Sequence, residues 1–240
     1  MTNAVTRFHR DGPPGVGMER WEEMEPSELL SGTPVQNGHT YHEIEAEGYI
    51  AGLWDYTAFV DHMGKYTVDE FMYLLEGTLI MRMPDGEEIN LKAGDAFVIP
   101  KGLECQWEQP GYLRKFFMIL DGPVPDTGCN PSLTRVTVPD LSGAAMASGA
   151  VTTERVDFVN AAGTMQVRTS THSAVTIPDL QVADHLLIQV LAGALTLTTD
   201  AGKEVFAARD TAYLRQGTRV GWSTSEGTHL LTSSYRSPAP

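Results

Sequence analysis

The sequence is poor in cysteine and in basic residues, and both shortages narrow the range of functions. Its 240 residues include only two cysteines, Cys105 and Cys129, which are too few for a disulfide framework. There are 17 lysines and arginines against 31 aspartates and glutamates, which gives a net charge of -14. A chain of this charge repels phosphate backbones, so we expect no nucleic-acid partner and no binding to an anionic membrane surface.

Long apolar runs and several common catalytic motifs are also absent from the sequence. No window approaches the roughly 20 apolar residues of a membrane span, and residues 1–17 lack the apolar core of a signal peptide. We therefore expect a soluble, cytoplasmic protein without a membrane partner. The lack of a Gly-rich phosphate loop, a Gly-x-Ser-x-Gly motif and a Cys-x-x-Cys pair disfavours dinucleotide enzymes, kinases and hydrolase-fold enzymes.

What the chain does contain is an internal repeat of about 115 residues. Gly77 and Gly86 are nine residues apart, as are Gly193 and Gly202. A second set of positions recurs with equal spacing in both halves: Asp95, Gly102 and Trp107, then Asp210, Gly217 and Trp222. Matched turn residues and a matched large aromatic predict a duplicated β-unit.

Short apolar or alternating runs separated by turns predict strands in both halves. Strands at this spacing favour an all-β fold of sandwich or barrel type. We expect four segments: an N-terminal arm over 1–45, a first barrel with the candidate site over 46–122, a linker over 123–150, and a degenerate, structural second barrel over 151–236.

Two motifs in the first half carry a resemblance to a known family. Glu70 is followed after six residues by Gly77, and Gly94 is followed after five residues by Pro100 and then by Gly102. Residues 50–120 resemble the cupin superfamily, in particular the ethanolamine-utilisation Q-type proteins and the related bicupin (S)-ureidoglycine aminohydrolases. The resemblance implies two tandem cupin jelly-roll barrels, a small-molecule ligand and a homodimer paired through sheet edges.

The resemblance also implies where a metal-loaded cupin would carry its ligands: Gly64, Tyr66, Glu70 and Cys105. Glycine has no donor side chain and tyrosine needs help to deprotonate, so only the glutamate is kept intact. We expect no metal in the first barrel. The alternative is one divalent ion (Zn, Mn, Fe or Ni) held by Glu70, Cys105 and His62. The glutamine of the aminohydrolases would fall at Cys105, which disfavours ureidoglycine chemistry.

In the second half the corresponding positions are all apolar, which predicts a barrel without a site: Leu180, Val182, Leu186 and Val220. His185 lies beside one of them and is expected to point to the other strand face, as an exposed or interface histidine.

The candidate catalytic residues are Glu70, Tyr66 and Cys105. A carboxylate inside a barrel costs several kcal/mol unless it is paired, hydrogen-bonded or protonated. Glu70 is therefore either a functional acid/base or metal ligand, or a structural residue held by Tyr66 or a backbone amide. Cys105 is either a nucleophile or a small apolar filler.

The candidate ligand-binding residues are Trp54, His62, Trp107 and Met72. The two tryptophans either stack on a ligand or fill the barrel, and His62 lies either at the barrel mouth or in solvent. We expect Arg114 and Lys115 to be solvated charges at a strand edge. The alternative is that they bind a substrate carboxylate.

Three functions follow from these candidates. The first is an enzyme of small-molecule metabolism, of hydrolase, isomerase or lyase type, acting on a small polar metabolite in the first barrel. The second is a metal-free small-molecule binder or sensor without catalysis, and the third is a structural or accessory protein. Metal content and ligand-induced stabilisation would separate them.

Overall fold

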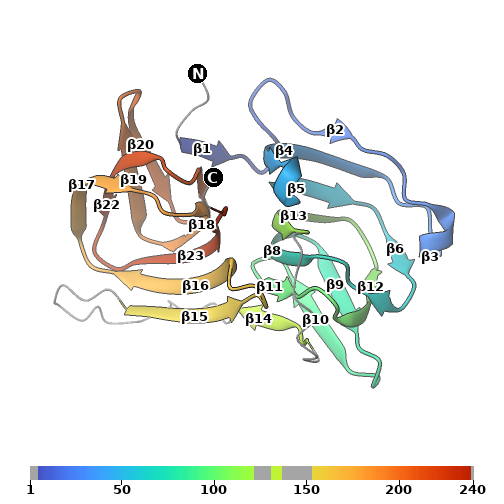
Figure 1. The fold of residues 1–240 in the computed structure, drawn as a ribbon. Coiled ribbons are helices and arrows are strands. Elements are labelled where there is room, and N and C mark those ends of the chain that lie inside the picture. Colours follow the sequence, from blue (N-terminus) through green and yellow to red (C-terminus); the bar gives the residue numbers. More distant parts are fainter. Residues whose placement is uncertain (1–4, 122–130, 137–152, 239–240) are drawn as a thin grey trace. The chain divides into compact units, whose positions relative to one another are not determined.

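A computed structural model describes residues 5–121, 131–136 and 153–238. Over these residues the chain forms twenty-three β-strands and two short 3₁₀ helices, η1 (Pro26–Glu28) and η2 (Glu45–Glu47). The chain divides into two compact units: residues 10–137, here called the first barrel, and residues 1–9 with 138–240, the second barrel. The predicted all-β fold of two barrels is confirmed (Figure 1).

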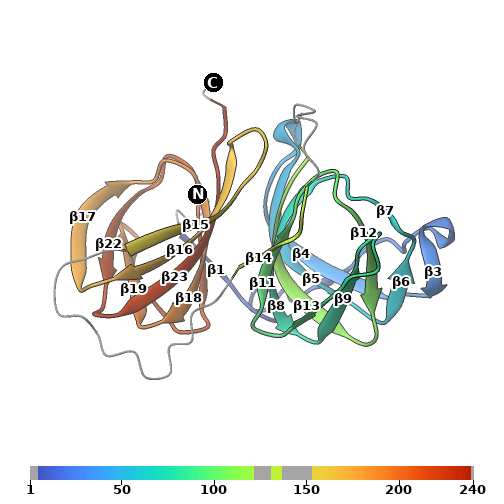
Figure 2. The ribbon, with the colours of Figure 1, turned by 90° about the horizontal axis from the view of Figure 1, so that it is seen from below.

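The first barrel is built from two antiparallel sheets that face each other across its interior (Figure 2). One sheet has the order β14 (Thr134–Val136), β11 (Ala96–Ile99), β8 (Asp69–Glu76), β13 (Leu113–Leu120), β5 (Tyr49–Tyr56), β4 (Gln36–Ile44) and β2 (Glu19–Arg20). The other has the order β10 (Glu88–Lys92), β9 (Thr78–Arg82), β12 (Glu104–Gln109), β6 (Phe59–Asp61) and β3 (Leu29–Gly32), with β7 (Gly64–Lys65) paired to β12.

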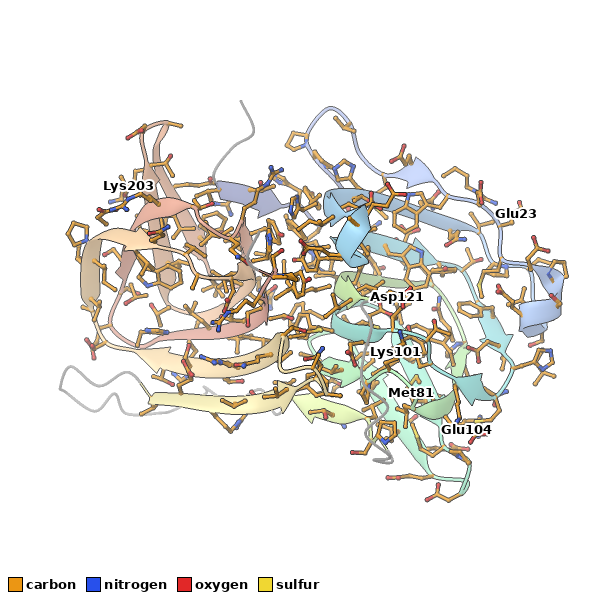
Figure 3. All side chains as sticks on the ribbon, viewed as in Figure 1. Glu23, Met81, Lys101, Glu104, Asp121 and Lys203 are labelled. Atoms are coloured by element: carbon orange, nitrogen blue, oxygen red, sulfur yellow. The ribbon has the colours of Figure 1, made fainter. Side chains whose placement is uncertain are left out.

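The second barrel repeats this plan with its own two sheets. The first has the order β1 (Val5–Phe8), β21 (Thr211–Leu214), β18 (His185–Ala192), β23 (Thr228–Tyr235), β16 (Met165–His172) and β15 (Thr153–Val159). The second has the order β17 (Val175–Gln181), β22 (Arg219–Thr224), β19 (Ala194–Thr199) and β20 (Gly202–Ala207). Lys203, labelled in Figure 3, belongs to β20.

Apolar side chains that alternate along the strands fill both interiors, as the period of two requires. The first interior is large and aromatic, and its buried members include Met81, Phe97 and Trp107. Met81, labelled in Figure 3, belongs to β9 and has no exposed surface. The second interior is mainly aliphatic, with Ile188 and Leu195 among its buried members beside the aromatic Phe206.

The residues shared by the two halves have the same structural tasks in each barrel. Asp95 accepts a hydrogen bond from the Lys92 amide at 3.0 Å, and Asp210 accepts one from the Ala207 amide at 2.9 Å. Each aspartate thereby closes the turn before a central strand. The predicted repeat is thus a repeat of turns and sheet order.

The expected N-terminal arm over residues 1–45 is instead divided between the two units. β4 pairs with β5 along its whole length and so extends the sheet of the first barrel. β1 pairs with β21 and belongs to the second barrel. The predicted linker, 123–150, lies outside the described residues except for 131–136, which include β14, and Cys129 lies outside them as well.

The two barrels carry an equivalent outer strand. β14 lies beside β11, where Arg135 pairs with Phe97, and β1 lies beside β21, where Arg7 pairs with Ala212. Arg135 also forms an ion pair with Asp95, and Arg7 forms one with Asp210, both at 2.8 Å. The segment that precedes each half in the sequence therefore completes the barrel of the other half.

No helix among the described residues is both long enough and apolar enough to cross a bilayer.

Candidate functional site

A buried ion pair lies in the interior of the first barrel. The Lys115 ammonium Nζ lies 2.8 Å from Glu70 Oε1, and the two side chains are only 2% and 4% exposed. The second carboxylate oxygen, Oε2, accepts a short hydrogen bond from the Tyr66 hydroxyl. Met72 Sδ completes the surroundings of the ammonium at 3.2 Å. Both oxygens of Glu70 are therefore engaged, as a buried carboxylate requires.

The position of Lys115 in the sheet explains why it points inward. β13 is an inner strand whose two edges pair with β5 and β8, and one of its faces lines the barrel interior, where Lys115 lies against Trp54 and Trp107. Lys115 pairs with Trp54 of β5 and with Leu74 of β8, next to a register shift between Arg114 and Lys115. Our interpretation of Lys115 as a solvated charge at a strand edge is wrong for this physical reason. Arg114 does point outward, with its side chain 21% exposed.

Two tryptophan rings flank the ammonium group. Lys115 Nζ lies 4.1 Å from the ring centroid of Trp54 and 4.8 Å from that of Trp107, within the range of cation–π attraction. The indole N–H groups are engaged elsewhere, with Gln36 Oε1 at 3.0 Å and Gln109 Oε1 at 3.2 Å. These bonds fix the two rings with their faces available to the cation.

Burial and charge shift the proton affinities of this group. Burial lowers the pKa of the Lys115 ammonium, and the Glu70 carboxylate opposes this shift only in part. Burial, followed by the charge of Glu70 and its hydrogen bond, raises the pKa of the Tyr66 hydroxyl well above its usual value. Tyr66 is therefore a hydrogen-bond donor here, because its phenolate form is strongly disfavoured.

Cys105 lies in the same apolar core and is 5% exposed. Burial, with a smaller contribution from the charge of Asp61, raises the pKa of its thiol to about 12. The thiol is protonated at neutral pH, and a protonated thiol is neither a nucleophile nor a good metal ligand.

His62 is placed apart from the buried residues. Alternation along one regular strand would place it on the same face as Tyr66 and Glu70, but the strand is interrupted between β7 and β8. The side chain of His62 is exposed as a result. The neighbouring Asp61 accepts a hydrogen bond from the Trp107 amide at 2.6 Å, and burial raises the pKa of its carboxyl group to about 6.

The structure thus brings together six of the seven predicted site residues in one interior: Trp54, Tyr66, Glu70, Met72, Cys105 and Trp107. Residues 51–117, which include all six, match the family model described as the EutQ-like cupin domain.

The first barrel has a cupin-type jelly-roll fold.

Solved structures show the same fold for the rest of the chain. A protein of unknown function of the DUF861 family from Pseudomonas syringae superposes with a TM-score of 0.71 at 17% identity, over 96% of this chain and 99% of the other. A putative dioxygenase from Nostoc punctiforme gives a TM-score of 0.60 at 13% identity, over 100% and 88%. The pirin YhhW from Escherichia coli, solved with nickel(II), gives 0.51 at 12% identity, over 98% and 100%. A search of curated proteins found no match.

A metal ion of the kind present in the nickel-bound neighbour does not fit the donors of the first barrel. No group of three or more His, Cys, Asp and Glu side chains within the described ranges is arranged to hold a metal. Glu70 is bonded to an ammonium group and a phenol, and the Cys105 thiol is protonated. A divalent ion at this place would also be repelled by the Lys115 charge.

Lys115 is the site residue whose burial and pairing with Glu70 the sequence analysis did not predict. The only signal was its position in the run Leu113–Leu120, where alternation puts it on the same face as the buried Leu113. A single lysine on the inner face of an apolar strand needs a buried partner, and Glu70 was already a candidate.

The second barrel has no comparable group at the matching positions. Val182 and Val220 are buried in its aliphatic core, and Leu180 and Leu186 pack against it. His185 is buried rather than exposed, and its Nδ1 lies 3.1 Å from the Tyr213 hydroxyl.

Proposed function

We propose that the first barrel binds a small polar metabolite without a metal ion, and that the Lys115 ammonium supplies the positive charge at the site. The ion pair between Lys115 and Glu70 carries this proposal. A buried pair of charges is weak evidence for stability, because replacement by packed apolar side chains is often neutral or stabilising. A group that costs this much desolvation and lies between two oriented tryptophans is better explained by ligand binding.

The chemistry of the group supports a ligand with oxygen or nitrogen atoms. The ammonium can donate further hydrogen bonds, the carboxylate can accept them, and the Tyr66 oxygen can accept one while its O–H is given to Glu70. The tryptophan faces can cover the apolar part of the same ligand and keep water away from the charges. These roles agree with cupin-type small-molecule metabolism, which is the general activity that the dioxygenase-like and pirin-like neighbours support.

The experiment combines metal analysis with ligand-induced stabilisation. The protein is purified without added metal, its metal content is measured, and its melting temperature is recorded against a panel of small hydroxy, oxo and amino compounds. We expect well under one equivalent of metal and at least one stabilising compound. The stabilisation should be lost in Lys115→Met and kept in Lys92→Met, since Lys92 is an exposed lysine of the same barrel.

One result would contradict the proposal directly. Near one equivalent of metal per chain, lost in Glu70→Ala, would make Glu70 a metal ligand and exclude its pairing with Lys115. Stabilisation that survives in Lys115→Met would place the ligand elsewhere.

Two finer assignments belong to the same proposal. The EutQ-like match supports the ethanolamine-utilisation Q-type branch. The aminohydrolase branch is disfavoured because its glutamine would fall at Cys105. The homodimer expected from the resemblance is tested by sedimentation of the purified chain.

A further inference from the structure

The proposed function uses Lys115 as a positive charge and leaves the nucleophilic character of its nitrogen unused. A lysine in an apolar, desolvated setting is a candidate for covalent chemistry, because its neutral amine becomes more accessible there. Lys115 is the only lysine or arginine among the buried charged residues that the structure describes. The other four lysines of the chain are Lys65, Lys92, Lys101 and Lys203, and none of them is buried.

The partners of Lys115 can take up and return a proton. Glu70 Oε1 lies 2.8 Å from Nζ, within direct proton-transfer distance. The Tyr66 hydroxyl, bonded to the other oxygen of Glu70, can steady either charge state of that carboxyl group. The amine therefore has a base in contact with it and a hydrogen-bond donor next to that base.

Solvent lies close to this group despite its burial. Trp54 and Tyr66 each contact the ion pair, and both are partly exposed. The ion pair is therefore in contact with two side chains that themselves reach solvent. Trp107, on the other side of the ammonium, is buried and held by Gln109.

We propose that Lys115 forms an imine with a small, uncharged aldehyde or ketone in the first barrel. The inference rests on the proposed function, since a metal bound by Glu70 would remove the base from Lys115. The uncharged class follows from the charges present, because Glu70 faces the amine and would repel a second carboxylate.

The steps balance without an added reagent. Lys115 gives a proton to Glu70, and its nitrogen lone pair attacks the carbonyl carbon while the carbonyl electrons move to oxygen. That oxygen and the nitrogen exchange protons through Glu70 to give a neutral carbinolamine. The hydroxyl group then leaves as water with the proton held by Glu70, and the nitrogen lone pair forms the C=N bond. The products are a protonated imine paired with the Glu70 carboxylate and one water molecule.

The test maps lysine labelling by reductive trapping. The wild-type protein is incubated with acetaldehyde or benzaldehyde and sodium cyanoborohydride, and peptide mass spectrometry gives the rate of alkylation at each lysine. Labelling controlled by exposure alone would favour Lys203 and Lys92 and spare Lys115. We expect the reverse, with Lys115 labelled about tenfold faster than either.

Matched variants separate the role of Glu70 from that of the fold. Glu70→Gln keeps the shape of the side chain and removes the base, so labelling at Lys115 should slow while labelling at Lys92 stays unchanged. Lys115→Arg keeps a cation that forms no imine, and the extra label should disappear. The central measurement uses the wild-type chain, so it does not depend on whether a variant folds.

The outcomes also separate this inference from the proposed function. A metal-free protein in which Lys115 is labelled no faster than the exposed lysines overturns the imine alone. A protein with one equivalent of metal overturns both.

Discussion

In the folded protein the Lys115 ammonium group is surrounded by one carboxylate, one thioether and two indole faces in place of water. Desolvation of the two charges is costly, and their attraction offsets it only while both partners are present. The pair should therefore behave as a unit in stability measurements.

Removing one partner should be much worse than removing both. Lys115→Met and Glu70→Leu each leave a buried charge without its counter-ion, and each should cost about 3–5 kcal/mol in free energy of unfolding. The double variant should cost far less than the sum of the two. Urea unfolding of the four proteins gives the coupling free energy, and additive costs would contradict a direct interaction.

Asp61 should give the first barrel a pH dependence of its own. Burial is the main cause that raises its pKa from 3.8 to about 6, so the folded state binds more protons than the unfolded state between these values. The stability that this protonation contributes is fully present below about pH 3.8 and is lost as the pH rises through about 6.

Asp61→Asn should remove this part of the pH profile. Urea unfolding from pH 4 to 7 should show the wild type losing stability relative to the variant across that window. Asp200→Asn, at an exposed turn, should leave the profile unchanged. Parallel profiles of wild type and Asp61→Asn would show that the carboxyl group titrates normally.

At the scale of the element, the turn between β8 and β9 depends on a glycine for two reasons. Gly77 has a φ of +86°, and a Cβ added there would lie 2.1 Å from the Tyr112 carbonyl oxygen. Gly86, in the next turn, has a φ of +89° but no atom within 4 Å of an added Cβ.

This pair of glycines separates backbone strain from steric contact. Gly86→Ala should lose roughly 1–2 kcal/mol of stability, which is the cost of the left-handed conformation. Gly77→Ala should lose clearly more, because backbone around Tyr112 must also move. Thermal unfolding of the two variants tests this, and equal losses would show that the contact is easily relieved.

At the scale of the whole molecule, the sequence predicted the number and type of the barrels but not every strand that builds them. Gly77, Asp95 and their partners in the second half are local turn signals, so their spacing is visible in the sequence. The sheet to which β1 belongs cannot be inferred from nearby residues, because its partner β21 lies about 200 residues away in the sequence. Its likeness to β14, Thr6-Arg7 against Thr134-Arg135, is too short to be found without the structure.

The inward direction of the Lys115 side chain was not predicted, for a related reason. Its direction depends on which face of β13 the barrel encloses, which is a property of the sheet rather than of the strand. The gathering of Glu70 with Tyr66 was visible from the sequence because the two lie four residues apart, whereas Lys115 lies 45 residues from Glu70.

Removal of residues 1–9 should weaken the second barrel and spare the first. Without β1, the edge of β21 is open and Asp210 loses the guanidinium of Arg7. Hydrogen exchange should become faster in residues 211–214 and stay unchanged in residues 96–99, where β14 remains in place. Faster exchange in both segments would mean that the two barrels unfold as one unit.

The outer strand of the second barrel also has a consequence for biosynthesis. Val5–Phe8 leaves the ribosome long before Thr211–Leu214, the strand with which it pairs. At about 5–20 residues per second, the interval is roughly 10–40 s. During that time the first barrel can close on residues already made, while the nascent N-terminus must stay unpaired and out of wrong pairings. Translation speed and chaperones that bind short extended segments should therefore affect the yield of the second barrel more than that of the first.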